Sequence, residues 1–239
     1  WKAGGSASSN SNGSITSSVS ANQDAGFSIV SYSGNGTAGA TIGHGLGAIP
    51  KMMIVRKRNS AENWLVYHAS TGNTGATLLN GTNAFFQDDM WNSTSPTSSV
   101  FTVHGGAGAN ASGGTYIAYC FADVQGYLKT GKWTGNGNND GPFSFCGFKP
   151  AFIMIKRTDV AKNWYINDNL RYGYNPSNPY LSPNLSAAET GGTEIDILSN
   201  GFKIRASGTG HNQSGGTYIF MAFAENPFVT STGVPATAR

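Results

Sequence analysis

Short apolar runs alternate with clusters of Gly, Asn and Ser along the chain. Met52–Val55 follows Pro50, and a second run, Trp64–Tyr67, follows the polar stretch Asn59–Asn63. Short apolar runs bounded by turn residues are typical of strands, and proline is tolerated where a strand begins. We therefore predict a hairpin whose first strand, continuously apolar, lies in the interior of a sheet.

A further strand is predicted after a glycine pair. Gly113-Gly114 precedes Tyr116–Ala122, and the pair indicates a tight turn or a bulge. No stretch of the chain keeps the 3.6-residue apolar period of a helix. These patterns together predict an all-β protein.

The chain repeats itself at a spacing of about 100 residues, as tandem units do. Four pairs of segments match in the same order: Gly47–Lys57 with Gly147–Arg157, Asn63-Trp64 with Asn163-Trp164, Ser112–Ile117 with Ser214–Ile219, and Phe121–Asp123 with Phe223–Glu225. Shared low complexity would not reproduce tryptophan, proline and an aromatic strand in one order. We therefore predict two units, residues 26–125 and residues 126–228.

The fold class that follows is all-β, with two tandem, internally duplicated antiparallel β-sandwich units of the jelly-roll or lectin-like kind. Residues 1–25, rich in Ser, Asn and Gly, are expected to be an entry segment or the remnant of a preceding unit, and residues 229–239 a polar C-terminal tail. The chain begins with Trp1 and not Met, so we expect a piece of a longer protein.

Composition narrows the class of partner. Only 11% of the 239 residues are charged, where globular proteins have about 25%, and the net charge is +3. The densest basic cluster, Arg56–Arg58, follows a predicted strand, and we read it as a solvated strand end, so nucleic acid is not expected. No apolar run approaches the roughly 20 residues of a membrane span, so membrane insertion is not expected either.

One segment has the residues of a catalytic acid pair. Glu194 and Asp196 alternate on a predicted strand, so they would share a face, as in the Glu-x-Asp-x-x-Glu strand of laminarinase-type glycoside hydrolases. The third acid is missing, since Leu198-Ser199 follows, and the first unit has Asn92–Thr94 in the matching place. We predict two strand-edge acids and no enzymatic activity, with a glycan-degrading enzyme as the alternative.

Metal and disulfide sites are not indicated. The loop Gly135–Gly141 has the Asn-x-Asn-x-Asp-Gly rhythm of a calcium loop, but the twelfth position, which needs a bidentate Glu, is Gly147. We predict a turn, no metal and no cofactor. Cys120 and Cys146 allow one disulfide at most, and their apolar contexts favour small buried side chains.

The segments that differ most between the units, residues 69–99 and 168–200, are the candidate recognition surfaces. They contain the aromatic residues Trp91, Tyr172, Tyr174 and Tyr180. An aromatic ring beside Asn and Asp offers a sugar both an apolar face and hydrogen-bond partners. These four residues are therefore the predicted glycan- or receptor-binding residues. The alternative is that they pack against the sandwich.

The repeated strings themselves resemble a domain of the tail-fibre and other virion appendage proteins of marine bacteriophages. The resemblance rests on segments from both units, including Pro50–Val55, Trp64–His68, Gly147–Arg157, Ser199–Arg205, Ser214–Ile219 and Met221–Phe228. The opening Trp1–Gly5 is also similar to an internal stretch of such proteins. The resemblance covers nearly the whole chain.

The resemblance implies a structural component on the virion surface, with a role in attachment to the host. Its implied partners are copies of itself, with a trimer expected, other virion proteins, and a host-surface glycan or receptor. It brings no catalytic residues. A bacterial cell-surface lectin or adhesin remains as a further alternative.

Overall fold

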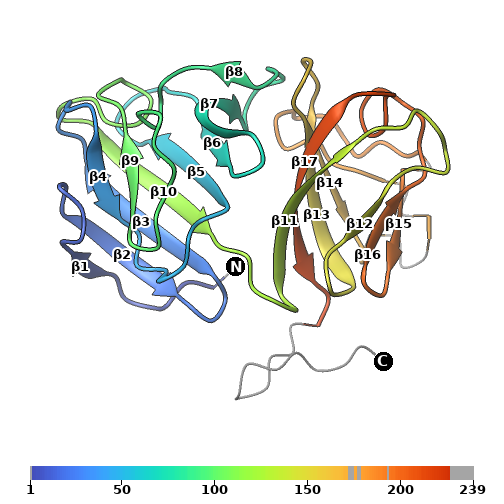
Figure 1. The fold of residues 1–239 in the computed structure, drawn as a ribbon, viewed down its shortest axis with the longest axis horizontal. Coiled ribbons are helices and arrows are strands. Elements are labelled where there is room, and N and C mark those ends of the chain that lie inside the picture. Colours follow the sequence, from blue (N-terminus) through green and yellow to red (C-terminus); the bar gives the residue numbers. More distant parts are fainter. Residues whose placement is uncertain (1, 172–174, 177–178, 193, 227–239) are drawn as a thin grey trace. The chain divides into compact units, whose positions relative to one another are not determined.

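The computed structural model describes residues 2–171, 175–176, 179–192 and 194–226. These residues form seventeen strands and no helix, and every ladder between strands is antiparallel. The all-β prediction is confirmed. Consequently, no helix in the described ranges is long and apolar enough to cross a membrane. The chain divides into two compact units, residues 1–81 with 85–123 and residues 82–84 with 124–239 (Figure 1).

The first unit contains an eight-stranded sheet and a two-stranded sheet. The larger sheet has the order β1-β2-β3-β10-β5-β6-β7-β8, and the smaller one pairs β4 with β9. The strands are β1 (Ser8–Asn10), β2 (Ser17–Asn22), β3 (Phe27–Ser33), β4 (Ala40–Gly43), β5 (Met52–Lys57), β6 (Leu65–His68), β7 (Gly72–Leu78), β8 (Phe86–Gln87), β9 (Val100–Val103) and β10 (Thr115–Phe121).

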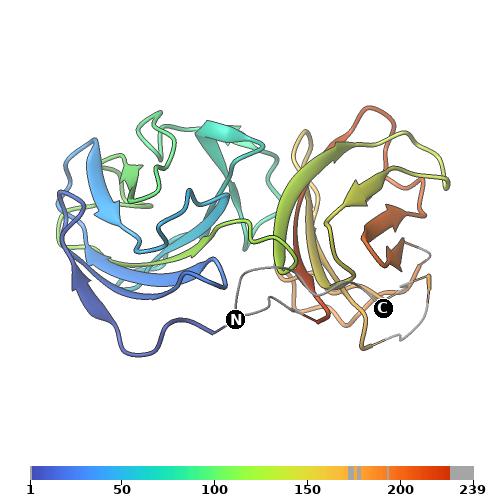
Figure 2. The same cartoon turned by 60° about the horizontal axis from the view of Figure 1, so that its bottom comes forward.

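The second unit contains a four-stranded sheet of order β11-β17-β13-β14 and a three-stranded sheet of order β12-β16-β15. Its strands are β11 (Leu128–Thr134), β12 (Phe143–Phe145), β13 (Pro150–Arg157), β14 (Trp164–Asp168), β15 (Ile195–Leu198), β16 (Gly201–Ile204) and β17 (Thr217–Ala224). Within each unit the smaller sheet faces the larger one, as in a sandwich (Figure 2).

The two units share one strand order. In the first, β10 lies between β3 and β5, with β6 beside β5; in the second, β17 lies between β11 and β13, with β14 beside β13. The predicted hairpin is confirmed as β5 and β6, and all four residues of Met52–Val55 are buried. The shared order supports the interpretation of the chain as a duplication.

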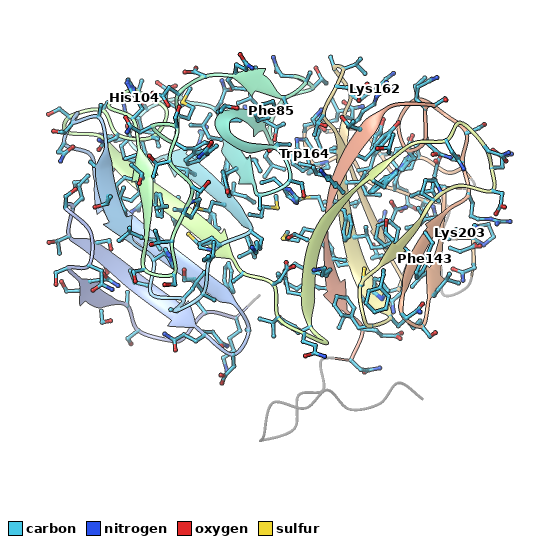
Figure 3. All side chains as sticks on the ribbon, in the orientation of Figure 1. Phe85, His104, Phe143, Lys162, Trp164 and Lys203 are labelled. Atoms are coloured by element: carbon cyan, nitrogen blue, oxygen red, sulfur yellow. The ribbon has the colours of Figure 1, made fainter. Side chains whose placement is uncertain are left out.

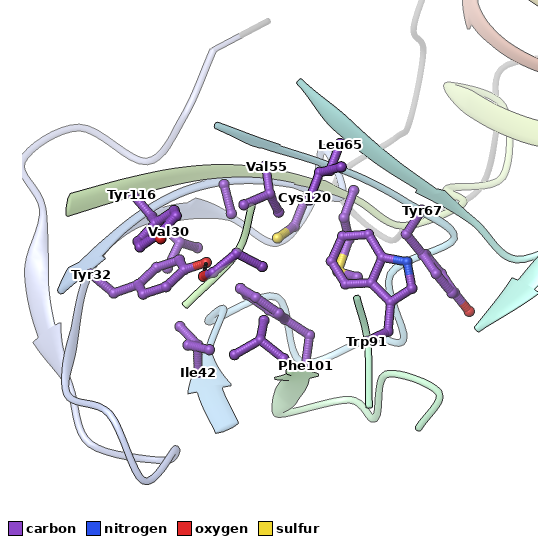
Figure 4. Packing of buried hydrophobic residues seen from close by; sticks show 14 of the residues in the cluster. Val30, Tyr32, Ile42, Val55, Leu65, Tyr67, Trp91, Phe101, Tyr116 and Cys120 are labelled. Atoms are coloured by element: carbon purple, nitrogen blue, oxygen red, sulfur yellow. Dashed lines mark hydrogen bonds between the residues drawn. The ribbon is translucent and has the colours of Figure 1, made fainter. Parts of the chain in front are cut away.

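The core of the first unit fills the space between its two sheets. Val30, Val55 and Cys120 of the larger sheet meet Ile42 and Phe101 of the smaller one (Figure 4). Along β10, the buried residues Tyr116, Ala118 and Cys120 alternate with less buried neighbours, because successive side chains of a strand point to opposite faces. Cys120 is a free thiol whose pKa is raised to about 12 by burial, which agrees with the predicted apolar role.

The core of the second unit is richer in aromatic rings. Trp133 stacks on Tyr218 at 5.0 Å between centroids and meets Phe202 edge-to-face at 5.8 Å. Ile153 and Ile155 of β13 complete the cluster from the larger sheet. Cys146 is also buried in this core and forms no disulfide. Aromatic pairs of this geometry add about 1 kcal/mol each to the burial of their surface.

Residues 2–25, expected to be an entry segment, belong to the first unit. β2 pairs with β3 along Ser18–Asn22, and Ile15 and Val19 are part of the core. Hydroxyl side chains alternate here with these few apolar ones, so one face of β2 is polar. The first unit therefore begins well before residue 26. The predicted tail 229–239 lies outside the described residues.

A pair of asparagines locks each unit, and we call this contact the amide clasp. In the first unit, Asn110 is fully buried; its Nδ2 donates to Asn35 Oδ1 (3.1 Å) and Thr37 O (2.9 Å), and its Oδ1 accepts from Asn35 N (3.0 Å). The same three bonds recur in the second unit among Asn212, Asn136 and Asn138, at 2.8, 2.7 and 2.9 Å. Each clasp ties the loop after β3 or β11 to the turn before β10 or β17.

We expect Asn212→Ala to lower the unfolding free energy of the second unit by about 1–3 kcal/mol, because a fully buried amide and its three hydrogen bonds are lost. Asn110→Ala should do the same to the first unit. Asn12, which is exposed, offers the matched control, and Asn12→Ala should stay within about 0.5 kcal/mol of the parent. Urea unfolding followed by tryptophan fluorescence measures the changes. Equal stability of all three variants would contradict a structural role for the clasp.

Candidate functional site

The predicted binding residue Trp91 lies inside the first unit. Its side chain is 1% exposed, its Nε1–H donates to Gly75 O at 2.9 Å, and its ring meets Tyr67 edge-to-face at 5.8 Å. The expectation that this ring is available to a sugar is corrected, since both its faces and its polar atom are used by the core. Figure 4 shows Trp91 next to Tyr67.

Of the three predicted tyrosines, Tyr180 is described, whereas Tyr172 and Tyr174 lie outside the described residues. Tyr180 is partly buried, and its backbone exchanges hydrogen bonds with Thr190 at 3.0 and 3.1 Å. Its ring meets Tyr165 of β14 edge-to-face at 4.9 Å. Tyr180 thus stands at the boundary between the variable segment and the sandwich.

Tyr180 is one member of a polar cluster, which we call the His211 cluster: Tyr165, Tyr180, Glu194 and His211. Glu194 directly precedes β15, and His211 lies in the loop between β16 and β17. His211 Nδ1 is 2.9 Å from Glu194 Oε2, and the imidazole lies 4.4 Å from the Tyr165 ring and 5.6 Å from the Tyr180 ring. In the first unit, the equivalent of His211 is Ala109, because each immediately precedes the buried clasp asparagine.

The imidazole is oriented and has one unused nitrogen. His211 is 3% exposed, and its Nε2 has no hydrogen-bond partner among the described residues. An Nδ1–H that donates to Glu194 leaves Nε2 as an acceptor in the neutral ring. Burial, with the nearby Tyr180 and Glu194, raises the pKa of Tyr165 to about 12. Burial and Glu194 also raise the pKa of Tyr180, so both phenols keep their protons at neutral pH.

The two acids of the enzyme hypothesis have different partners. Glu194 faces His211, whereas Asp196 Oδ2 is 3.3 Å from Arg205 Nε. Asp196 lies opposite Lys203 on the outer face of β15 and β16, while its neighbours Ile195 and Ile197 face the core. A glycosidase needs both carboxyl groups directed at one bond. In this arrangement the carboxyl groups of Glu194 and Asp196 are directed at different partners and not at one common point.

The predicted turn Gly135–Gly141 uses its polar atoms internally. Asn136 Oδ1 and Asn138 O accept from the clasp amide of Asn212. The exposed carboxylate of Asp140 lies 2.5 Å from Lys203 Nζ, and this contact lowers the pKa of Asp140. In the described part of the chain, no three His, Cys, Asp or Glu side chains gather as metal ligands would. The loop is therefore held by amide hydrogen bonds within it and with Asn212, and by the ion pair with Lys203.

The variable segment of the second unit is fastened to the sandwich by polar contacts. Arg171 Nε is 2.5 Å from Asp168 Oδ2, its Nη1 is 3.1 Å from Glu189 Oε2, and its Nη2 donates to Ile166 O at 3.1 Å. Asn184 accepts from Trp164 N at 3.0 Å. Three leucines of this segment are exposed: Leu170 (89%), Leu181 (39%) and Leu185 (49%).

Comparison with known proteins gives one result. The family model of a domain of unknown function, DUF7483, matches residues 1–227. The chain belongs to this family. No curated protein and no solved structure matches it. Since the match runs from the first residue through both units, the DUF7483 region includes β1 and β2 as well as the two sandwiches.

Sequence reasoning missed His211 in this DUF7483 chain. The four histidines are scattered and none recurs between the units, so no spacing singled it out. Its partners come from β14, from the variable segment and from the start of β15, which only the fold brings together. Among the described residues, the Nε2 of the imidazole has no hydrogen-bond partner, and its Nδ1 faces Glu194.

We expect Glu194→Leu to destabilise the second unit by about 1–3 kcal/mol, because the buried Nδ1–H of His211 would lose its acceptor. Glu194→Leu combined with His211→Phe should recover most of this loss, since the polar pair is then replaced by apolar groups. Glu189→Gln, at an exposed acid in the same unit, is the control. Chemical unfolding of the parent, Glu194→Leu, His211→Phe and the double variant completes the cycle, with the control measured beside them. Additive losses in the double variant would show that the two side chains do not depend on each other.

Proposed function

We propose that this chain is a structural component of a bacteriophage virion appendage, such as a tail fibre, and that it takes part in attachment to the host surface. The sequence resemblance described above favours this class of protein. The all-β architecture without helices is compatible with it. Under this proposal the chain is located on the virion surface.

The observation that carries the recognition role is the contrast between framework and variable segments. Strand order and amide clasp are the same in both units, so they serve the fold. The units differ in the segment that follows the hairpin of β5 and β6 or of β13 and β14: in the first unit it forms β7 and β8, whereas in the second it carries exposed leucines and lies beside the His211 cluster. Segments displayed by a rigid sandwich are common places for binding residues.

The described part of this segment has the chemistry of a recognition surface. Leu170, Leu181 and Leu185 supply apolar area, while Tyr180 and the ion pair of Arg171 with Glu189 supply polar groups. The contacts of Arg171 and Asn184 hold the segment before a ligand arrives, which lowers the entropy lost on binding. A host-surface glycan or glycosylated receptor is the proposed ligand.

The proposal also includes association with copies of the same chain and with other virion proteins. Oligomers of identical chains are usually symmetric, and a trimer is our proposal for the fibre. The low share of charged residues, 11%, suits a surface that packs against identical copies without like-charge repulsion.

We predict that the purified chain binds cells of the host bacterium and competes with phage adsorption. Leu170→Ser combined with Leu185→Ser should weaken cell binding by about tenfold or more, as loss of interface anchors does. Ile49→Ser is the matched control, since Ile49 of the first unit is 48% exposed, close to the 49% of Leu185. Binding of the labelled proteins to cells is measured by flow cytometry.

Two results would contradict the recognition role. One is cell binding that the leucine variant leaves unchanged, and the other is an equal loss in the Ile49→Ser control. Cleavage of a host polysaccharide by the unmodified chain would favour the enzyme alternative. An adsorption assay in which the chain binds cells but never competes with phage would favour a bacterial lectin.

A further inference from the structure

The strand β12 of the second unit is an open sheet edge. It is the end strand of the order β12-β16-β15. Ile204 N donates to Pro142 O and Cys146 N donates to Asn200 O, so residues 142, 144 and 146 face β16 in the alternating antiparallel pattern. The backbone N–H and C=O groups of Phe143 and Phe145 therefore point away from β16. Among the described residues, no segment outside the sheet forms a backbone hydrogen bond with either of them.

The side chains at this edge are apolar and exposed. Phe143 is 45% exposed and Phe145 is 62% exposed, and both lie on the outer face of the smaller sheet. Figure 3 labels Phe143 with its cross-strand neighbour Lys203. Natural proteins usually protect such edges with charged residues, prolines or a covering segment, and an apolar open edge marks a place where another strand pairs.

The first unit shows what covers the equivalent edge. There β4 takes the place of β12, and residues 14–17 lie along it. Ile15 N donates to Thr41 O at 3.0 Å in a parallel bridge, Thr41 N donates to Ser14 Oγ at 2.9 Å, and Ser17 Oγ donates to Gly43 O at 2.8 Å. The Ile15 side chain enters the core between the sheets.

The segment that covers β4 has no counterpart before the second unit. The first unit has the whole of residues 1–26 ahead of β3, whereas only residues 122–127 separate β10 from β11. Those few residues are used to turn the chain, with Tyr127 N donating to Val124 O. The strand order of the second unit accordingly begins at β11, and residues 122–127 supply no strand to pair with β12.

We propose that the β12 edge is a docking site for an extended strand of another polypeptide, one with a β-branched apolar residue flanked by Ser and Thr, which pairs parallel to β12. The seated segment Ser14–Ser17 of the first unit is the pattern for this partner, and strand addition to a sheet edge is a known mode of peptide recognition. The partner strand satisfies the outward backbone groups of Phe143 and Phe145 and covers their rings. The inference does not depend on the proposed host attachment.

A peptide test uses the full chain and a labelled peptide with the sequence of residues 8–22. We expect binding by fluorescence anisotropy, together with slower hydrogen exchange at the amides of Phe143 and Phe145. A peptide with proline in place of Ile15 lacks the N–H that donates in the first unit, so it should bind about tenfold more weakly or worse. Absence of binding by the parent peptide would overturn the proposal.

Variants of the chain locate the peptide. Phe145→Lys places a charge at the open edge and should weaken binding by about tenfold, whereas Phe145→Leu should keep it. Ile49→Lys, at the 48% exposed residue of the first unit, is the matched control and should bind as the parent does. If Phe145→Lys binds like the parent, the peptide has exchanged into the first unit or adheres elsewhere, and the proposal fails. Circular dichroism of each variant verifies that it is folded.

Discussion

Each unit depends on the insertion of its last strand into the middle of its larger sheet. β10 pairs with β3 along Phe27–Ser33 on one side and with β5 along Met52–Lys57 on the other, and β17 does the same between β11 and β13. Without this strand, β3 or β11 has no partner on that side, and the core loses the ring of Tyr116 or Tyr218. The contacts that define the fold are therefore long-range, and their loop-closure entropy must be offset before they stabilise the unit.

The amide clasp helps to hold β10 and β17 in the middle of their sheets through contacts between loops. Asn110 and Asn212 lie in the turns that lead into β10 and β17, and they hold the loops that follow β3 and β11. The clasp thereby fixes the register of β10 against β3 and of β17 against β11, because a shift by one residue would break its hydrogen bonds. The segment between β14 and β15 takes no part in the clasp, so its sequence can differ between the units. In the second unit it carries the exposed leucines and lies beside the His211 cluster.

Local patterns predicted the framework well, because strands and turns have local signals. The hairpin of β5 and β6 was predicted from the apolar runs Met52–Val55 and Trp64–Tyr67. The strands β10 and β17 were predicted from the glycine pairs that precede them. β2 was missed since its hydroxyl-rich sequence shows little apolar alternation, and its place depends on the edge of β3. Trp91 was predicted to be exposed, but it is buried because of its contacts with Gly75 and Tyr67, which lie in other segments. The His211 cluster was not predicted because its residues come from segments that are far apart in the sequence.

We propose two surfaces of different use in the second unit: the open edge of β12 for backbone pairing, and the segment after β14 for side-chain recognition. Both suit an appendage that assembles from repeated chains and contacts a cell. The most direct measurement of that central claim is immunogold electron microscopy of the virions whose genome encodes this chain, with antibodies raised against the purified protein. The proposal predicts gold label along a tail fibre or another surface appendage. Virions that carry no label, with the antigen confined to bacterial cells, would contradict it.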